Sequence, residues 1–209
     1  KNAFSRLRQS FRTSREGQSK KKIRAPRYLF LLASGAGLAT GATMSFAGFL
    51  VLFSVDLGFS LEASAAVMVA GSFAGIGARI FLGFWADTAK SGHLLMVQFL
   101  MIGGSIGMVL VAVSGNFEVL VIGTLLVFAM GWSWNGVFQF AIIRSGPASS
   151  AYFTGIVQAA MMAGATVGPP IFSILIQANY PTAWIFLACT MALSAGLVRW
   201  GMIEMGRIV

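Results

Sequence analysis

The chain has 209 residues, of which 57% are hydrophobic and only 10% are charged, and its formal net charge is +9. Soluble domains carry about 25% charged residues, so this chain has too few charges to cover the surface of a soluble fold. The first 27 residues hold ten of the fifteen Lys and Arg residues, so the net charge does not indicate nucleic-acid binding. A single cysteine and a single histidine exclude a disulfide framework and a metal cluster, and no pattern predicts a cofactor or an enzyme.

Residues 1–27 form a basic segment in which Glu16 is the one acidic residue. Beside a membrane span, this composition is typical of a cytoplasmic tail or of a linker between two membrane domains. An Arg- and Ser-rich segment also suits an organellar transit peptide, but a transit peptide normally begins with Met, whereas residue 1 is Lys. We therefore expect a tail or interdomain linker, in a chain that continues upstream or has been cut at Lys1.

Six apolar stretches follow, each close to the length of about 20 residues that a helix needs to cross the hydrocarbon core. Short connections that contain Gly, Pro, Asn or Asp separate them. The expected spans are residues 28–55, 61–84, 94–113, 119–143, 152–177 and 182–203. The predicted fold class is therefore an all-α integral membrane protein in which residues 28–209 form a bundle of six transmembrane helices.

The positive residues lie on one side of this arrangement. The tail, the connection after the second span, the Arg144 connection and the C-terminal end hold all fifteen Lys and Arg residues, and the three alternate connections hold none. Because such residues favour the cytoplasmic side of a membrane, both termini are predicted to be cytoplasmic. The expected location is the bacterial inner (plasma) membrane.

Small residues and prolines mark particular positions inside the spans. Glycines recur at four-residue spacing, which lets membrane helices approach closely, so we expect these pairs to serve helix packing. The pairs are Gly37/Gly41, Gly71/Gly75, Gly103/Gly107 and Gly164/Gly168. Pro169 and Pro170 in the fifth span remove two backbone donors, and they predict a bend in that helix or freed carbonyl groups.

The most specific motif lies at the end of the second span, where Arg79, Gly83 and Asp87 are spaced four residues apart. On a continuous helix, residues at this spacing form one stripe. The segment resembles the Gly-X-X-X-Asp-Arg-X-Gly-Arg-Arg signature of the major facilitator superfamily, with Gly83 and Asp87 matching its Gly and Asp. Thr88 replaces the usual Arg, and Lys90 is what remains of the terminal basic group. A weakened copy of this kind is typical of the second half of these transporters.

The resemblance implies that the six helices are helices seven to twelve, one half of a major facilitator fold. The implied partners are the lipid bilayer, a small-molecule solute and an N-terminal six-helix half that is absent here. The implied function is secondary transport by alternating access, with Arg79, Gly83, Asp87 and Lys90 forming a cytoplasmic latch to the other half. The alternative interpretation of the loop is a positive-inside anchor with a chance Asp. The segment from Gly164 to Pro169 also resembles a Gly-X-X-X-Gly-Pro pattern found in helix five of some antiporters and echoed in helix eleven.

Polar residues at the middle of a membrane span are costly, so they mark candidate substrate contacts. In this family helices seven, ten and eleven line the central cavity, which selects the first, fourth and fifth spans. The candidates are Thr40, Thr43, Phe46, Trp132, Trp134, Asn135, Gln139, Gln158 and Met162. They offer stacking and neutral hydrogen bonds, and no Asp, Glu, Lys or Arg lies near a midplane, so charge-pairing groups are expected from the other half. The alternative is that these polar groups bond neighbouring helices.

Other classes of six-span protein fit less well. Mitochondrial carriers, aquaporins and intramembrane proteases each require a motif that this sequence lacks. A permease subunit of the ABC type stays open as an alternative, although it would leave the Gly83 and Asp87 match unexplained. A six-span interaction or assembly protein without transport of its own also stays open.

Overall fold

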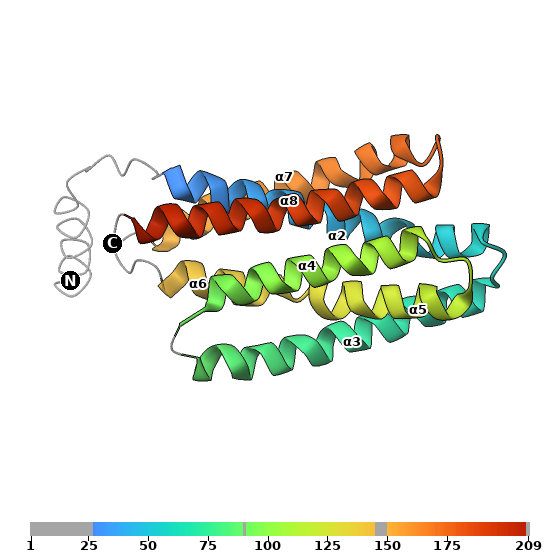
Figure 1. The fold of residues 1–209 in the computed structure, drawn as a ribbon, viewed down its shortest axis with the longest axis horizontal. Coiled ribbons are helices and arrows are strands. Elements are labelled where there is room, and N and C mark those ends of the chain that lie inside the picture. The colour runs from blue at the N-terminus through green and yellow to red at the C-terminus, as the bar shows by residue number, and fades with distance from the viewer. Residues whose placement is uncertain (1–26, 90, 145–149, 208–209) are drawn as a thin grey trace, which may run out of the picture.

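The computed structural model describes residues 27–89, 91–144 and 150–207 as a bundle of long helices, and these residues contain no strand (Figure 1). The helices are α2 (Arg27–Asp56), α3 (Leu61–Thr88), α4 (His93–Ala112), α5 (Phe117–Leu126), α6 (Trp134–Arg144), α7 (Ser150–Leu175) and α8 (Tyr180–Gly206), with a π-helical turn η1 (Val127–Gly131) between α5 and α6. Counting α5, η1 and α6 as one span, six segments are long and apolar enough to cross a membrane. The predicted all-α bundle of six membrane helices is confirmed, and the span ends lie within a few residues of those expected.

Helix starts at one end of the bundle are fixed by polar caps. The side chains of Ser60, Asn116 and Asn179 accept hydrogen bonds from backbone N–H groups three residues later, at 3.2, 2.9 and 2.8 Å. Each cap satisfies a donor that the first helical turn would otherwise leave without a partner. These three residues come from the short connections that the sequence assigned to one side of the membrane.

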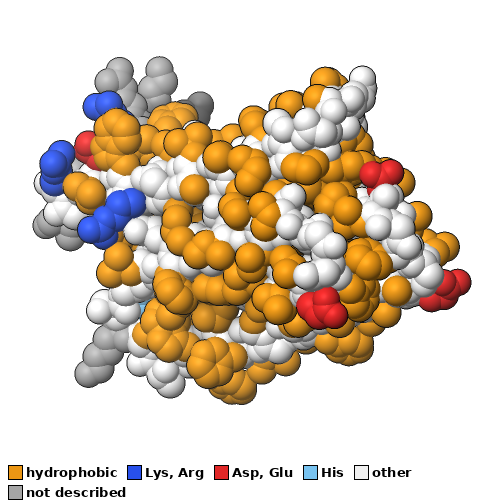
Figure 2. Space-filling view, turned by 45° about the vertical axis from the view of Figure 1, so that its right-hand side comes forward, with side chains coloured by type: hydrophobic (Ala, Val, Ile, Leu, Met, Phe, Trp, Pro, Cys, Tyr) orange, Lys and Arg blue, Asp and Glu red, His pale blue; other side chains and the backbone are white. Residues whose placement is uncertain are grey.

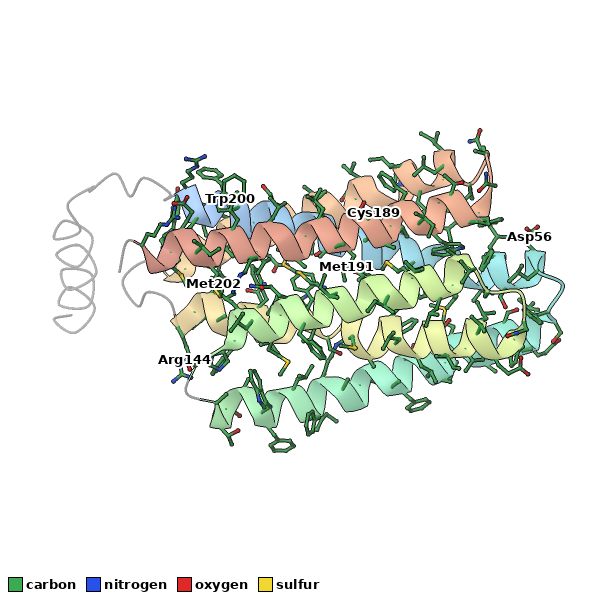
Figure 3. All side chains as sticks on the ribbon, in the orientation of Figure 1. Asp56, Arg144, Cys189, Met191, Trp200 and Met202 are labelled. Atoms are coloured by element: carbon green, nitrogen blue, oxygen red, sulfur yellow. The ribbon has the colours of Figure 1, made fainter. Side chains whose placement is uncertain are left out.

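Charged residues separate between the two ends of the bundle. Asp56 and Arg144 lie at opposite ends (Figure 3). Figure 2 shows arginines at the left end, with one acidic side chain beside them, and three acidic side chains toward the right, with hydrophobic side chains between. This is the charge separation that the sequence predicted for a chain with six spans.

The helix contacts follow the same pattern in the two halves of the bundle. In the first half, α2 packs against α7 and α8 and touches α3. In the second half, the α5–η1–α6 span packs against α3 and α4, and α6 touches α7. The remaining large contact joins α4 to α8. Exchanging α2, α3 and α4 with the fourth, fifth and sixth spans therefore preserves every major contact. We call these two units the first and the second repeat.

Glycines form the closest helix contacts. A Cβ atom added to Gly37 would lie 2.8 Å from the backbone oxygen of Ala160, and one added to Gly41 would lie 2.9 Å from that of Gly164. In the equivalent contact of α3 with η1, a Cβ on Gly75 would lie 3.0 Å from the backbone oxygen of Phe128. Each glycine of the four predicted pairs lies against a neighbouring helix, at backbone atoms or, for Gly71 and Gly103, at a side chain. This confirms their role in helix packing.

The bundle leaves two helices largely uncovered. Only 22% of the most apolar segment of α3 and 17% of that of α7 is buried, against 44% to 56% in the other four spans. Helices α3 and α7 are the equivalent members of the two repeats. Each therefore presents most of its surface to whatever surrounds the bundle.

Candidate functional site

The fourth span is interrupted near its middle. In η1 the N–H of Trp132 donates to the carbonyl of Val127 at 3.0 Å, five residues back, and the N–H of Ser133 donates to Met130 at 3.2 Å. The sequence predicted one continuous helix here, so the interruption is a correction. At the end of η1 the fourth span lies close to α4, where a Cβ on Gly131 would lie 3.0 Å from the Cα of Gly104. Interrupted helices of this kind recur at functional sites in membrane proteins.

Five of the nine candidate contacts lie on a partly open face formed by the fourth span and α7. Trp132, Asn135 and Gln139 are partly exposed, and Gln158 and Met162 of α7 are exposed. The Trp132 ring stacks on Phe128, with ring centroids 5.5 Å apart and the planes 4° from parallel, which holds the indole in place. This arrangement brings together the polar residues that follow the interruption and those of α7.

A pair of side-chain amides joins the two elements of this face. The Nε2 of Gln139 donates to the Oε1 of Gln158 at 3.1 Å and lies 3.6 Å from the sulfur of Met161. The Oε1 of Gln139 is buried, and no described residue donates to it. A buried carbonyl oxygen without a donor is costly, so the hydrogen bonding of the Gln139 amide is incomplete among the described residues.

The other four candidates are enclosed by the helices of this chain, and their expected place at a cavity stays a prediction. Thr40 donates to the carbonyl of Ala36 at 2.8 Å, and Thr43 donates to that of Ala39 at 3.0 Å. Phe46 is fully buried against aromatic rings of the fourth and sixth spans, and Trp134 is 1% exposed and packs edge-on against Phe138. Their polarity or size alone did not reveal which side of the helix they occupy.

The Arg79, Gly83 and Asp87 stripe lines a groove between α3 and α6. The groove has a volume of about 240 Å³, and Ser133, Gly136 and Phe140 are among the residues on its other wall. A Cβ atom added to Gly83 or to Gly136 would meet no atom within 4 Å, so neither glycine serves a contact inside the bundle. Among the described residues, neither Arg79 nor Asp87 has an ion-pair partner.

Lys90, the fourth member of the expected latch, lies outside the described residues. The two prolines of the fifth span lie inside α7, which continues through both of them as one helix. Because proline has no N–H, Pro169 and Pro170 leave the carbonyls of Ala165 and Thr166 without their usual helical donors. The expected freed carbonyl groups therefore result from the continuity of α7 through both prolines.

Two residues of the groove had no signal in the sequence. Gly136 and Phe140 look like ordinary constituents of an apolar span, and only the position of α6 beside α3 gives them a role.

Neither a protein-family model nor a curated protein matches this sequence. The function is therefore argued from the residues and their arrangement.

Proposed function

We propose that this chain is one half of a major facilitator-type secondary transporter, which moves a small solute across the membrane by alternating access. The observation that carries the proposal is the repetition in the packing. Three helices followed by three helices with equivalent contacts is the internal organisation of each six-helix half in this superfamily. Because each repeat has an odd number of spans, the second repeat enters the membrane from the opposite side.

The groove between α3 and α6 supports the proposal that Arg79, Gly83 and Asp87 form a latch. Arg79 and Asp87 present opposite charges along one stripe, with the uncrowded Gly83 between them. A helix end from a second bundle could approach the glycine closely, and its positive N-terminal dipole would be complemented by Asp87. The large uncovered surface of α3, which forms one wall of this groove, supports the same second bundle as its partner.

The face around the interruption supports a neutral, hydrogen-bonding solute. It offers the Trp132 ring and the Asn135 and Gln139 amides, and none of these residues is charged. We place both termini on the cytoplasmic side of a bacterial plasma membrane, since the arginine-rich end of the bundle follows the positive-inside rule.

The proposal is tested by solute flux into proteoliposomes that contain the complete gene product. A broad panel of neutral solutes should include one that accumulates or equilibrates faster than in protein-free vesicles. If the complete protein moved no solute in the panel, the alternative of a six-span assembly protein would replace the transporter.

The latch is tested separately by Asp87→Asn in the same complete protein. Loss of the charge should shift the balance of inward- and outward-facing states by about 0.3–1 kcal/mol, the usual contribution of a charge at a helix end. Cysteine accessibility from each side of the membrane reports that balance, and membrane insertion should be unchanged. Asp56→Asn, at the opposite end of the bundle, is the matched control. Equal accessibility in the parent and the Asp87→Asn protein would contradict the latch.

A further inference from the structure

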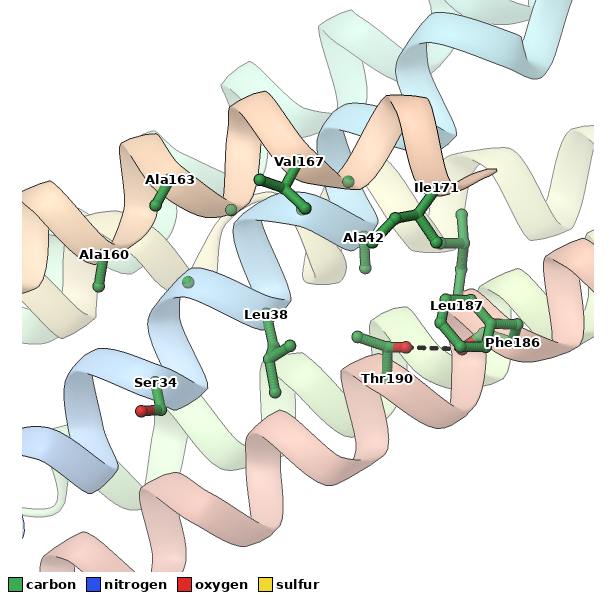
Figure 4. A pocket seen from close by; sticks show the side chains of 14 residues that line it. Ser34, Leu38, Ala42, Ala160, Ala163, Val167, Ile171, Phe186, Leu187 and Thr190 are labelled. Atoms are coloured by element: carbon green, nitrogen blue, oxygen red, sulfur yellow. Dashed lines mark hydrogen bonds between the residues drawn. The ribbon is translucent and has the colours of Figure 1, made fainter. Parts of the chain in front are cut away.

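A second groove lies along α2, between α7 and α8 (Figure 4). Helices α7 and α8 both pack on α2 but have little contact with each other, which leaves a groove of about 510 Å³. Gly37, Gly41, Gly164 and Gly168 are among its lining residues, and their lack of side chains makes room in it. Its walls include Leu38 from α2, Ala163, Val167 and Ile171 from α7, and Phe186 from α8.

The lining of this groove is apolar apart from two hydroxyl groups. Thr190 donates to the carbonyl of Phe186 at 2.8 Å within its own helix, so its hydrogen is already used (Figure 4). The other hydroxyl belongs to Ser34, at the end of the groove nearer Arg27. A polar solute would lose its hydration here without gaining hydrogen bonds, whereas a hydrocarbon chain would lose nothing.

An exposed stripe of α2 leads from the basic end of the bundle into the groove. Arg27 and Ser34 are seven residues apart and so lie on one face, and Phe30 between them is 57% exposed. From Arg27 to Leu38 the helix rises about 16 Å, which is close to half of the 30 Å hydrocarbon core, roughly one leaflet. The groove therefore lies below the positive charge of Arg27, and Leu38 lies at about the depth that one lipid acyl chain reaches.

We propose that this groove binds an anionic phospholipid, with its phosphate at Arg27 and one acyl chain along Ser34, Leu38 and Ala163. Charge decides between this occupant and a second copy of the chain. Arg27 is exposed on this face, so two copies meeting here in the same membrane orientation would bring their Arg27 side chains together. An anionic headgroup is complementary to Arg27. The proposal does not depend on the transport function.

The test uses the full chain reconstituted in vesicles of equal parts phosphatidylglycerol and phosphatidylcholine, released in mild detergent and examined by native mass spectrometry. The parent should retain phosphatidylglycerol in preference to phosphatidylcholine. Ala163→Phe fills the groove and should abolish the retained phosphatidylglycerol. Ala70→Phe, at an exposed alanine of α3 away from the groove, should behave as the parent does. Arg27→Gln should lower the preference about fivefold, as expected for one basic residue near a membrane surface.

Ala163→Leu provides a milder substitution, and size-exclusion elution shows whether each variant is folded and monodisperse. Equal retention of the two lipids by the parent would overturn the proposal. Unchanged retention by both folded Ala163 variants would also overturn it, because the preference would then come from the basic segment alone. If the Ala163 variants changed the oligomeric state and left lipid retention unchanged, the occupant would be a second copy and the proposal would be wrong.

Discussion

The two repeats share their pattern of helix contacts but differ in their first helix. In the first repeat, α2 runs unbroken for 30 residues. Its counterpart in the second repeat is divided into α5, η1 and α6, and the interruption lies where the fourth span meets Gly104 of α4. Equivalent packing therefore does not require equivalent helix geometry. It is the broken helix that carries the partly open polar face.

The two equivalent contacts that join the repeats also differ in what their glycines touch. In the contact of α2 with α7, the glycines meet backbone atoms from both sides, including the carbonyls of Gly37 and Gly41. In the equivalent contact of α3 with η1, Gly71 faces the ring of Phe128, with 2.6 Å from an added Cβ to the nearest ring carbon. A side-chain ring can rotate away, whereas a helix backbone cannot, so the first contact is the less tolerant of the two.

The largest effect is expected from Gly164→Leu, because its side chain would occupy the position of the Gly37 carbonyl. The substitution should force α2 and α7 apart and lower the free energy of unfolding by about 3 kcal/mol or more, the upper range for overpacking. Gly71→Leu should cost less, about 1–2 kcal/mol, since Phe128 can move. Reversible unfolding in detergent, followed by circular dichroism, measures both.

Gly155→Leu is the control, because an added Cβ there would meet nothing within 4 Å. It should be neutral or raise stability by up to about 1 kcal/mol, as expected when a helical glycine is replaced. A cost for Gly71→Leu equal to that for Gly164→Leu would show that the two contacts are equally rigid.

A smaller effect is expected from the polar bridges of the two repeats. Gln139 and Gln158 join α6 to α7, and Ser64 donates to Ser54 at 2.9 Å to join α3 to α2. The Ser64 hydroxyl also lies 2.8 Å from the carbonyl of Ser60, which competes for its one hydrogen. Double-mutant cycles with alanine should give a coupling energy up to about 1.7 kcal/mol for the glutamine pair and about 0.6 kcal/mol or less for the serine pair. A larger coupling for the serines would reverse the comparison.

The smallest effect is expected from Thr40→Val in α2. Its hydroxyl bonds only a carbonyl of its own helix, and the valine has nearly the same shape, so stability should change by no more than about 0.5 kcal/mol. Solute flux by the complete protein should also be unchanged. Asn135→Leu is the matched comparison, because Asn135 lies on the open face and its loss should reduce flux. Impaired flux in the folded Thr40→Val protein would mean that Thr40 does reach the solute.

The sequence predicts where the spans begin and end, but not which face of each helix is buried. Span ends follow from hydropathy and from breaker residues such as Asn116 and Asn179, whose caps act within three residues of the chain. The π-helical turn from Val127 to Gly131 has no such signal, since it contains no proline and no side chain caps it. The direction of Thr40 and Thr43 was equally undetermined, because a polar residue in an apolar helix can face a cavity or bond its own backbone.

The hydrogen bonds inside α2 also bear on how the protein is made. The main partner of α2 is α7, and Gly164 is synthesised roughly 130 residues after Gly37, a delay of about 6–25 s at ordinary translation rates. During that time α2 waits in the bilayer without its neighbour. Thr40, Thr43 and Ser45 each donate to a carbonyl of the same helix, so no hydroxyl hydrogen among them is left without an acceptor in the lipid. Helix α2 therefore satisfies these hydroxyl groups by itself before α7 arrives.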